Sequence, residues 1–330
     1  MKIIAEAGVN HNGSIHTAFK MVDAAVRAGA DYIKFQTFHA DALVTFQCEA
    51  AGYQKDNAGA SRQKEMLKKL ELTYDDFIKL KDYCDSVGIG FLSTPFDEES
   101  ISFLASLKPD YMKVPSGEIT NLPYLRQMAL TGIPVIISTG MALPEDIALA
   151  MKPFRKAGYA SVDTILLHCT TQYPTPMSDV NLKAMKTLGS TFGCPTGYSD
   201  HTLGIEVPIA AAALGAVIIE KHFTLDRQME GPDHRASIEP HELKAMVETV
   251  HNVEKALGDG VKEVKESERS NIIAARRSIV AARHIDKGQI ISETDICAKR
   301  PGNGLSPMLW DKVIGAKAIR DFEPEELIEL

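Results

Sequence analysis

Short apolar runs alternate with amphipathic segments along most of the chain. The runs are rich in valine, isoleucine and aromatic residues and are bounded by turn residues, as in the strands of a parallel sheet. Between them, apolar residues recur at the three- and four-residue spacing of α-helices. We therefore expect eight strands, near residues 3–6, 32–36, 90–94, 111–115, 135–139, 164–169, 195–198 and 217–222.

Eight strand–helix units predict an α/β fold of the TIM (β/α)8 type, because that fold needs roughly 250 residues for its eight units. No GxGxxG or GxxxxGK[ST] motif follows any of the expected strands. The sequence therefore argues against dinucleotide-binding and P-loop folds. The connection after the second strand, residues 38–61, is long and is typical of a functional loop.

Polar residues are concentrated at the C-terminal ends of the expected strands. We apply the two-residue alternation of a strand and direct the branched apolar residues outward, toward the helices. The inner face is then expected to carry Glu6, Lys34, Gln36, Thr94, Lys113, Ser138, His168, Glu220 and His222. Charged side chains are rarely buried without a partner, and TIM barrels build their active sites at this end. The pattern predicts an active site there.

Two histidines end neighbouring expected strands. His201 follows the seventh strand and His222 ends the eighth, so a short connection between parallel strands brings the two side by side. A single histidine is more often a structural residue than a ligand. A pair of imidazoles at one end of a barrel indicates a metal site.

The other polar residues indicate which ligands this end of the barrel can bind. Lys34 and Lys113 provide two cations, and Glu6 and Glu118 provide carboxyl groups for proton transfer. Tyr173 can donate a hydrogen bond to a hydroxylated substrate. Small hydroxyl residues and glycines near helix starts form a cradle for a phosphate or carboxylate, namely Ser116, Gly117, Ser138, Thr139 and Gly140.

Composition narrows the range of partners. The net charge of −8 disfavours nucleic-acid binding and means that an anionic substrate needs a locally positive pocket. Five scattered cysteines, never spaced as CxxC, predict neither disulfide bonds nor a thiolate zinc site. The chain lacks an apolar run long enough for a membrane span and lacks the pattern of a signal peptide. We expect a cytoplasmic protein without membrane partners.

A change in composition marks a domain boundary. After Lys255 the chain becomes charged and contains glycines, and short strand-like runs separated by turns follow. We expect a catalytic barrel over residues 1–258, a linker over 259–271 and a small domain over 272–330.

The motifs AEAGVNHNGS, KFQTF, KVPSGE, GYSDHT, EKHFTLD and KRPGNG are distributed over the whole chain. Together they resemble the bacterial sialic acid synthases, the N-acetylneuraminate synthase group of the nonulosonic acid synthases. The resemblance implies a TIM barrel followed by an antifreeze-like (SAF, β-clip) domain, in a domain-swapped homodimer. It also implies a transferase that condenses phosphoenolpyruvate with an open-chain N-acetylhexosamine and releases phosphate by C–O cleavage.

The same resemblance implies roles for individual residues. A divalent metal, manganese first and magnesium or cobalt as alternatives, is bound by His201 and His222. The residues implied for phosphoenolpyruvate are Lys34, Thr94, Lys113, Ser116, Ser138, Gly140 and Ser199. Those implied for the sugar are Gln36, Asn57, Tyr173, Asp233 and, acting in trans, Arg300. Glu118 is the favoured proton-transfer residue, and Glu6 completes the catalytic pair and helps to orient the sugar.

Several functions remain open at this point. The main expectation is synthesis of N-acetylneuraminate from phosphoenolpyruvate and N-acetylmannosamine. The same motifs are similar in synthases that make N,N'-diacetyllegionaminate from a 2,4-diacetamido-2,4,6-trideoxyhexose, which is the alternative. A non-catalytic sugar-phosphate binder does not need two histidines, two lysines and two glutamates in one pocket. Ice binding is disfavoured because KRPGN and RDFEPEE cannot form a flat, largely uncharged surface.

Overall fold

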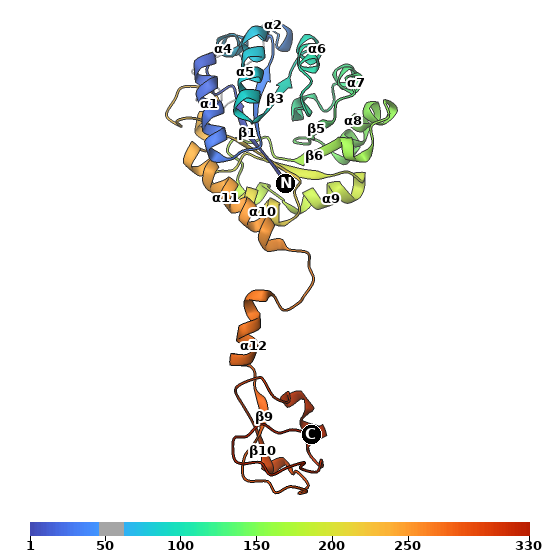
Figure 1. Cartoon of the computed structure of the whole chain (residues 1–330). Coiled ribbons are helices and arrows are strands. Elements are labelled where there is room, and N and C mark those ends of the chain that lie inside the picture. Colours follow the sequence, from blue (N-terminus) through green and yellow to red (C-terminus); the bar gives the residue numbers. More distant parts are fainter. Residues whose placement is uncertain (46–62) are drawn as a thin grey trace. The chain divides into compact units, whose positions relative to one another are not determined.

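The computed structural model describes residues 1–45 and 63–330. These residues form two compact units, Met1–Gly258 and Asp259–Leu330, and each is considered by itself (Figure 1). Asn57, expected to bind the sugar, lies outside the described residues.

The first unit contains eight parallel strands in a nearly closed barrel (Figure 1). Their hydrogen-bonded order is β3-β2-β1-β8-β7-β6-β5-β4. All eight expected strands are present, and their bounds are β1 Lys2–Gly8, β2 Tyr32–Thr37, β3 Gly90–Pro95, β4 Met112–Val114, β5 Val135–Ser138, β6 Thr164–His168, β7 Thr196–Asp200 and β8 Ile218–His222. The prediction of a TIM barrel is therefore confirmed.

Helices surround this barrel, and local sequence signals set their ends. In the first of them, the Ser14 hydroxyl accepts a hydrogen bond from the Thr17 N–H at the start, and Gly29, with φ of 83°, ends the helix. The helices are α1 Ile15–Ala28, α2 Ala40–Leu43, α4 Gln63–Leu70, α5 Tyr74–Val87, α6 Glu98–Ser106, α7 Leu122–Leu130, α8 Pro144–Lys156, α9 Lys183–Phe192, α10 Glu206–Ala213 and α11 Pro240–Leu257. Among the described residues, no helix combines the length and the apolar character that crossing a bilayer requires.

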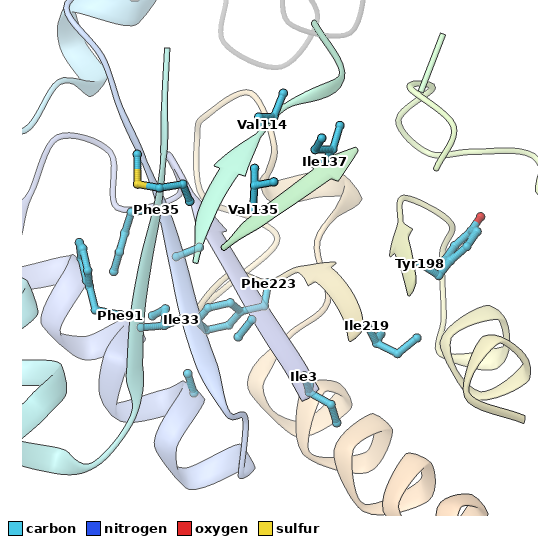
Figure 2. Close-up of a cluster of buried hydrophobic side chains, with 14 of the residues drawn as sticks. Ile3, Ile33, Phe35, Phe91, Val114, Val135, Ile137, Tyr198, Ile219 and Phe223 are labelled. Atoms are coloured by element: carbon cyan, nitrogen blue, oxygen red, sulfur yellow. The ribbon is translucent and has the colours of Figure 1, made fainter. Parts of the chain in front are cut away.

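The main hydrophobic core lies between the outer faces of the strands and the helices. Figure 2 shows part of it, including Ile3, Ile33, Phe35 and Ile219, all of which are fully buried. Burial of one such side chain contributes about 1.5–3 kcal/mol to stability. This core fixes which residues of each strand face the interior of the barrel.

The interior of the barrel has an apolar layer beneath its polar end. This layer includes Ile4, Leu92, Ile136, Ile165, Leu167 and Ile218. The rule that branched residues all point outward is therefore wrong for these positions, because a barrel interior must also be filled with side chains.

The same layer corrects the orientation expected for His168. Because Ile165 and Leu167 point inward, His168 points to the outer face. Its Nε2 lies 2.9 Å from the Val180 carbonyl oxygen, and its ring packs edge-on against Tyr198. His168 is therefore a structural residue on the helix-covered side of the barrel wall, and it does not belong to the candidate site.

The second unit contains helix α12 (Arg269–Ala275), the antiparallel strands β9 (Ser278–Ala281) and β10 (Ile296–Lys299), and the short helix α13 (Trp310–Val313). Its small core includes Ile279, Ile285, Ile291, Phe322 and Ile328. Helix α12 begins within residues 259–271, where the sequence predicted a linker.

Candidate active site

Five ionisable side chains converge inside the C-terminal end of the barrel. They are Glu6 on β1, Lys34 on β2, Lys113 on β4, and Glu220 and His222 on β8. Each exposes less than a tenth of its surface, and Lys34 and Lys113 expose only 3%. Such burial is costly for a charged group unless other charges compensate it. The site must therefore contain its own ion pairs or bind a charged ligand.

A network of ion pairs joins the two lysines to two glutamates. Lys34 Nζ lies 2.8 Å from Glu6 Oε2 and 3.6 Å from Glu220 Oε2. Lys113 Nζ lies 3.9 Å from Glu220 Oε1. Glu220 thus lies between two cations, and Glu6 is paired with one of them.

Hydroxyl groups surround this network. Lys34 Nζ donates a hydrogen bond of 3.1 Å to Thr94 Oγ1, and Lys113 Nζ donates one of 2.7 Å to Ser138 Oγ. The Ser199 hydroxyl donates to Glu220 Oε1 at 3.0 Å. Thr94, Ser138 and Ser199, which the sequence assigned to anion binding, are therefore in contact with the charged residues.

The two buried glutamates have opposite pKa shifts. Burial raises the pKa of Glu6 to about 7, although the charge of Lys34 acts against this rise. Burial also acts to raise the pKa of Glu220, but Lys113 and Lys34 outweigh it and hold that pKa at about 2. Burial acts to lower the pKa of Lys34, whereas Glu220 and Glu6 together raise it above its ordinary value. Glu6 is thus the group that can gain or lose a proton near neutral pH.

The net charge of this network is small. Two lysines are balanced by two carboxyl groups, so the four side chains bring at most one net positive charge when Glu6 is protonated. A doubly or triply charged anion needs more positive charge than this. A cation bound next to the network would provide it.

The rings of His201 and His222 lie side by side, with centroids 5.5 Å apart. Parallel pairing of β7 with β8 brings them together, as the sequence predicted. Burial lowers the pKa of both imidazoles, so both are neutral at neutral pH. Neutral imidazole is the form that binds metal ions.

Hydrogen bonding leaves nitrogen lone pairs of the two histidines available to a metal. His201 Nδ1 lies 2.5 Å from the carbonyl oxygen of Thr170 and must therefore donate, which leaves the lone pair on Nε2. His222 Nδ1 is buried and has no hydrogen-bond partner among the described residues. The two residues fit a metal that takes two protein nitrogens and completes its coordination with water or substrate. Within residues 1–45 and 63–330, no group of three or more His, Cys, Asp or Glu side chains has the geometry of a metal site.

Ser116 and Gly140 form a second polar corner. The Gly140 N–H donates a hydrogen bond of 3.0 Å to Ser116 Oγ. A Cβ atom at Gly140 would lie 2.6 Å from Thr171 Cγ2, so only glycine fits there. Cys169 Sγ lies 3.3 Å from Ser116 Oγ, which sequence reasoning missed. The sequence does contain a signal for this contact, because the two-residue alternation of side chains places Cys169 on the same inward face as Leu167.

Three of the residues expected to bind the sugar line one cavity. Gln36, Tyr173 and Asp233 share a cavity of about 210 Å³ with His222. Gln36 Nε2 donates to Glu6 Oε1 at 3.4 Å, and the ring centroid of Tyr173 lies 4.1 Å from that of His201. Asp233 is buried, and burial raises its pKa to about 6. The structure therefore places Gln36, Tyr173 and Asp233 beside the histidine pair.

Two expected residues are not joined to this cluster. Glu118 is partly exposed in the turn Ser116–Glu118, where its carboxylate accepts a hydrogen bond of 2.6 Å from Asn121 Nδ2. No hydrogen bond or ion pair within the described part of the chain joins Glu118 to the buried network. Arg300 belongs to the second unit, where it is exposed and its Nε donates to the Ala275 carbonyl at 3.0 Å.

Sequence reasoning also missed an ion pair on the outer faces of the histidine-bearing strands. Lys221 pairs with Asp200, and both are 1% exposed. Lys221 Nζ also donates to the Thr202 carbonyl at 2.6 Å. Asp200 Oδ1 accepts from the Thr202 N–H at 3.1 Å, and Oδ2 accepts from its hydroxyl at 3.0 Å. These bonds fix the turn that contains His201 to strand β8.

Comparisons with known proteins identify the family. Residues 21–262 match the NeuB family and residues 276–329 match the SAF domain. The chain is similar to N,N'-diacetyllegionaminic acid synthases of two bacteria. With that of Campylobacter jejuni it shares 46% identity over 99% of this chain and 98% of that protein. With that of Legionella pneumophila it shares 48% identity over 96% of this chain and 89% of that protein.

A solved structure supports the same assignment. The N-acetylneuraminic acid (sialic acid) synthetase of Leptospira borgpetersenii, in complex with citrate, matches 82% of this chain and 89% of that chain. The two share 37% identity, with a TM-score of 0.73. The chain therefore belongs to the NeuB family of nonulosonic acid synthases, phosphoenolpyruvate-dependent condensing enzymes, and it has a C-terminal SAF domain.

Proposed function

We propose that this enzyme condenses phosphoenolpyruvate with a 2,4-diacetamido-2,4,6-trideoxyhexose and water, giving N,N'-diacetyllegionaminate and phosphate. The main support for this reaction is the pair of buried lysines next to a pair of neutral histidines at the C-terminal end of the barrel. The sugar assignment rests on two relatives named as legionaminate synthases, at 46% and 48% identity. The sialic acid synthetase shares less identity, 37%. These values favour the alternative of the sequence analysis over N-acetylneuraminate.

Phosphoenolpyruvate is assigned to the lysine side of the site. Lys34 and Lys113 can neutralise its carboxylate and phosphate, because both ammonium groups are buried at the strand ends. The hydroxyls and amides that surround them can bind the remaining oxygens, and we assign this role to Thr94, Ser116, Ser138, Gly140 and Ser199. Charge-assisted bonds of this kind are about twice as strong as neutral ones.

A divalent cation is assigned to His201 and His222, with manganese first and magnesium or cobalt as the alternatives. When bound, such an ion supplies Lewis acidity at the aldehyde oxygen of the open-chain sugar. It also provides positive charge that the nearly neutral network of lysines and glutamates lacks. Chelation is expected to abolish turnover, and added manganese is expected to restore it. Full activity of His222→Ala after exhaustive chelation would contradict the assignment.

The reaction requires two proton transfers. The C3 carbon of phosphoenolpyruvate attacks the aldehyde carbon, and the aldehyde oxygen becomes an alkoxide that needs a proton. Water adds at C2 and gives up one proton. The C2–O bond to phosphate then breaks, and phosphate takes the remaining hydroxyl proton and leaves the C2 ketone. Glu6, with its pKa raised to about 7 by burial, is suited to give the first proton at neutral pH. Glu118, which is partly exposed, is assigned to accept the proton of the attacking water.

Gln36, Tyr173, Asp233 and Asn57 are assigned to the sugar, with Arg300 contributed by the other subunit of a domain-swapped homodimer. Support for Arg300 comes from its exposure in a small second unit, where its Nε donates to a backbone carbonyl. An exposed guanidinium can bind the hydroxyl or amide oxygens of a sugar. Since phosphoenolpyruvate is a cytosolic metabolite, we assign the enzyme to the cytoplasm.

Phosphate release tests the proposed reaction. The enzyme is incubated with phosphoenolpyruvate, manganese and either the 2,4-diacetamido-2,4,6-trideoxyhexose or N-acetylmannosamine. Each sugar is tested separately. We expect the rates of phosphate release to differ, with the higher kcat/KM for the trideoxy sugar. A higher kcat/KM for N-acetylmannosamine would favour sialic acid synthesis. No release with either sugar would favour a non-catalytic binder.

A further inference from the structure

The cavity that contains the proposed sugar residues has two chemically different walls. Gln36, Tyr173, His222 and Asp233 form a polar wall. Seven apolar residues also line the cavity, namely Val9, Phe38, Leu43, Met66, Leu67, Leu70 and Phe96, and Gln63 lines it at the start of α4. The seven apolar residues pack into one small hydrophobic cluster and are called the apolar wall. A sugar in this cavity therefore meets hydrogen-bonding groups and a hydrocarbon surface together.

The apolar wall belongs to connections on the active-site face. Helices α2 and α4 lie in the connection that follows β2, and Phe96 follows β3 directly. Connections that follow barrel strands lie above the strand ends, on the side where the substrate enters. The polar side chains Gln36 and His222 lie on the strands themselves. The part of the apolar wall on α2 and α4 is therefore farther along the chain from the strand ends than Gln36 and His222 are.

This arrangement orients a hexose in the site. Its aldehyde carbon, C1, must lie near the histidine pair and the lysines for the condensation to occur. The acetamido group on C2 is adjacent to C1 and stays near the polar side chains. The opposite end of the open chain, C6, is then directed toward the connections that hold α2 and α4.

We propose that the apolar wall recognises the C6 methyl group of a 6-deoxy sugar and disfavours a C6 hydroxymethyl group. This inference rests on the proposed function and identifies residues that select its sugar. A methyl group on this surface is removed from water at no cost in hydrogen bonds. A hydroxyl group packed against these seven apolar side chains loses its bonds to water and gains none from them.

The expected size of the effect is moderate. Hydrophobic pockets reject a ligand that carries one additional hydroxyl by only about 100-fold. Wild-type enzyme should therefore prefer the trideoxy sugar to its 6-hydroxy counterpart by about that factor in kcat/KM. The appropriate counterpart is the 2,4-diacetamido-2,4-dideoxyhexose of the same configuration, which differs only at C6.

Met66 allows a matched pair of variants. Met66→Gln keeps the length of the side chain and adds an amide that can bond the C6 hydroxyl, so the preference should fall about tenfold or more. Met66→Leu keeps the wall apolar at nearly constant volume and should leave the preference unchanged. Leu43→Gln, at a half-buried position of the same wall, provides a second polar variant in case Met66→Gln does not fold. Calorimetric affinity for phosphoenolpyruvate checks that each variant retains an intact site.

The measurement is the ratio of kcat/KM for the two sugars, from phosphate release with manganese. A ratio near 100 that falls in the polar variants and persists in Met66→Leu supports the inference. A wild-type ratio near 1 overturns it, and so does a high ratio that both polar variants retain. If wild-type enzyme releases phosphate with neither sugar, the proposed function itself is wrong, and the inference is overturned together with it.

Discussion

Lys221 on β8 is ion-paired with Asp200 on β7, on the outer faces of the two strands that position His222 and His201. Both charged groups are buried, and both also bond Thr202. The pair therefore fixes the end of one strand to the end of the next. Since each histidine is adjacent in sequence to one member, the ion pair sets the separation of the two imidazoles.

Lys221→Met is expected to lower the affinity for manganese by about 10- to 100-fold, as seen when residues that orient metal ligands are removed. Affinity for phosphoenolpyruvate in the absence of metal should change little. The measurement is a manganese titration followed by electron paramagnetic resonance. The variant also leaves the buried Asp200 carboxylate without its ion-pair partner, which should cost about 3–5 kcal/mol of stability.

The double variant Asp200→Asn/Lys221→Met separates the loss of stability from the loss of manganese affinity. It contains no uncompensated buried charge, so it should regain much of the lost stability. Its manganese affinity should remain low, because the bonds that fix the His201 turn to β8 are still missing. Wild-type manganese affinity in a stably folded Lys221→Met protein would show that the pair does not position the histidines.

Lys113→Ala is expected to weaken phosphoenolpyruvate binding by about 2–5 kcal/mol, because it removes one partner of a desolvated charge pair. Affinity for the sugar should change far less. Calorimetry with each ligand separates the two effects. Lys152→Ala, at an exposed lysine on α8, is the control and should behave as wild type. Equal losses for both ligands would contradict the assignment of Lys113 to the anion.

His11 is expected to make folding stability depend on pH. Its side chain is 1% exposed, and burial, together with His234, lowers its pKa to about 4. In the unfolded chain the pKa is near the ordinary value of 6.5, so the unfolded state binds the proton more readily. The contribution to stability is therefore fully present above pH 6.5 and declines as the pH falls toward 4.

Urea unfolding at pH 7 and pH 5 measures this effect. Between pH 7 and pH 5, the free energy of unfolding of wild type should fall by about 2 kcal/mol more than that of His11→Gln. His16→Gln, at an exposed histidine of α1, should retain the wild-type dependence. Identical pH dependence in His11→Gln and wild type would mean that His11 can be protonated in the folded state.

Arg300 is expected to act in the active site of the partner subunit. Glu118→Ala and Arg300→Ala proteins, each nearly inactive, are unfolded together and reassembled. If Arg300 acts in trans, half of the dimers are mixed and each has one intact site, so about a quarter of wild-type activity returns. If it acts in cis, every site contains one lesion and mixing restores nothing.

The sequence predicted the barrel well because its strands are short, apolar and separated by amphipathic helices. All eight strands occur within about two residues of their expected bounds, which is the usual uncertainty of element ends. The alternation of side chains also brought together Glu6, Lys34, Lys113 and Glu220, from four strands. The charge of these residues indicated the site, because charged side chains are rare inside a barrel.

Other features depend on tertiary context that alternation alone does not contain. His168 was placed inside because Ile165 and Leu167 were assigned to the helix-covered face, whereas the barrel interior needs them as filling. Lys221 alternates with Glu220 and His222 and so lies on the outer face of β8, and its partner Asp200 can be recognised only once β7 and β8 are paired.

The apolar wall of the sugar cavity was also beyond sequence reasoning. Phe38, Met66 and Phe96 come from separate segments and meet only when the connections after β2 and β3 fold over the strand ends. Their hydrophobicity by itself is equally consistent with ordinary core residues.

The most direct test of the account uses phosphoenolpyruvate that carries oxygen-18 in the bridging C–O–P position. The enzyme is supplied with this substrate, manganese and the 2,4-diacetamido-2,4,6-trideoxyhexose, and the products are analysed by mass spectrometry. The proposed reaction gives a nine-carbon 2-keto acid without the label and phosphate that contains it, because the C–O bond breaks. Unlabelled phosphate, or pyruvate without a nine-carbon acid, would contradict it.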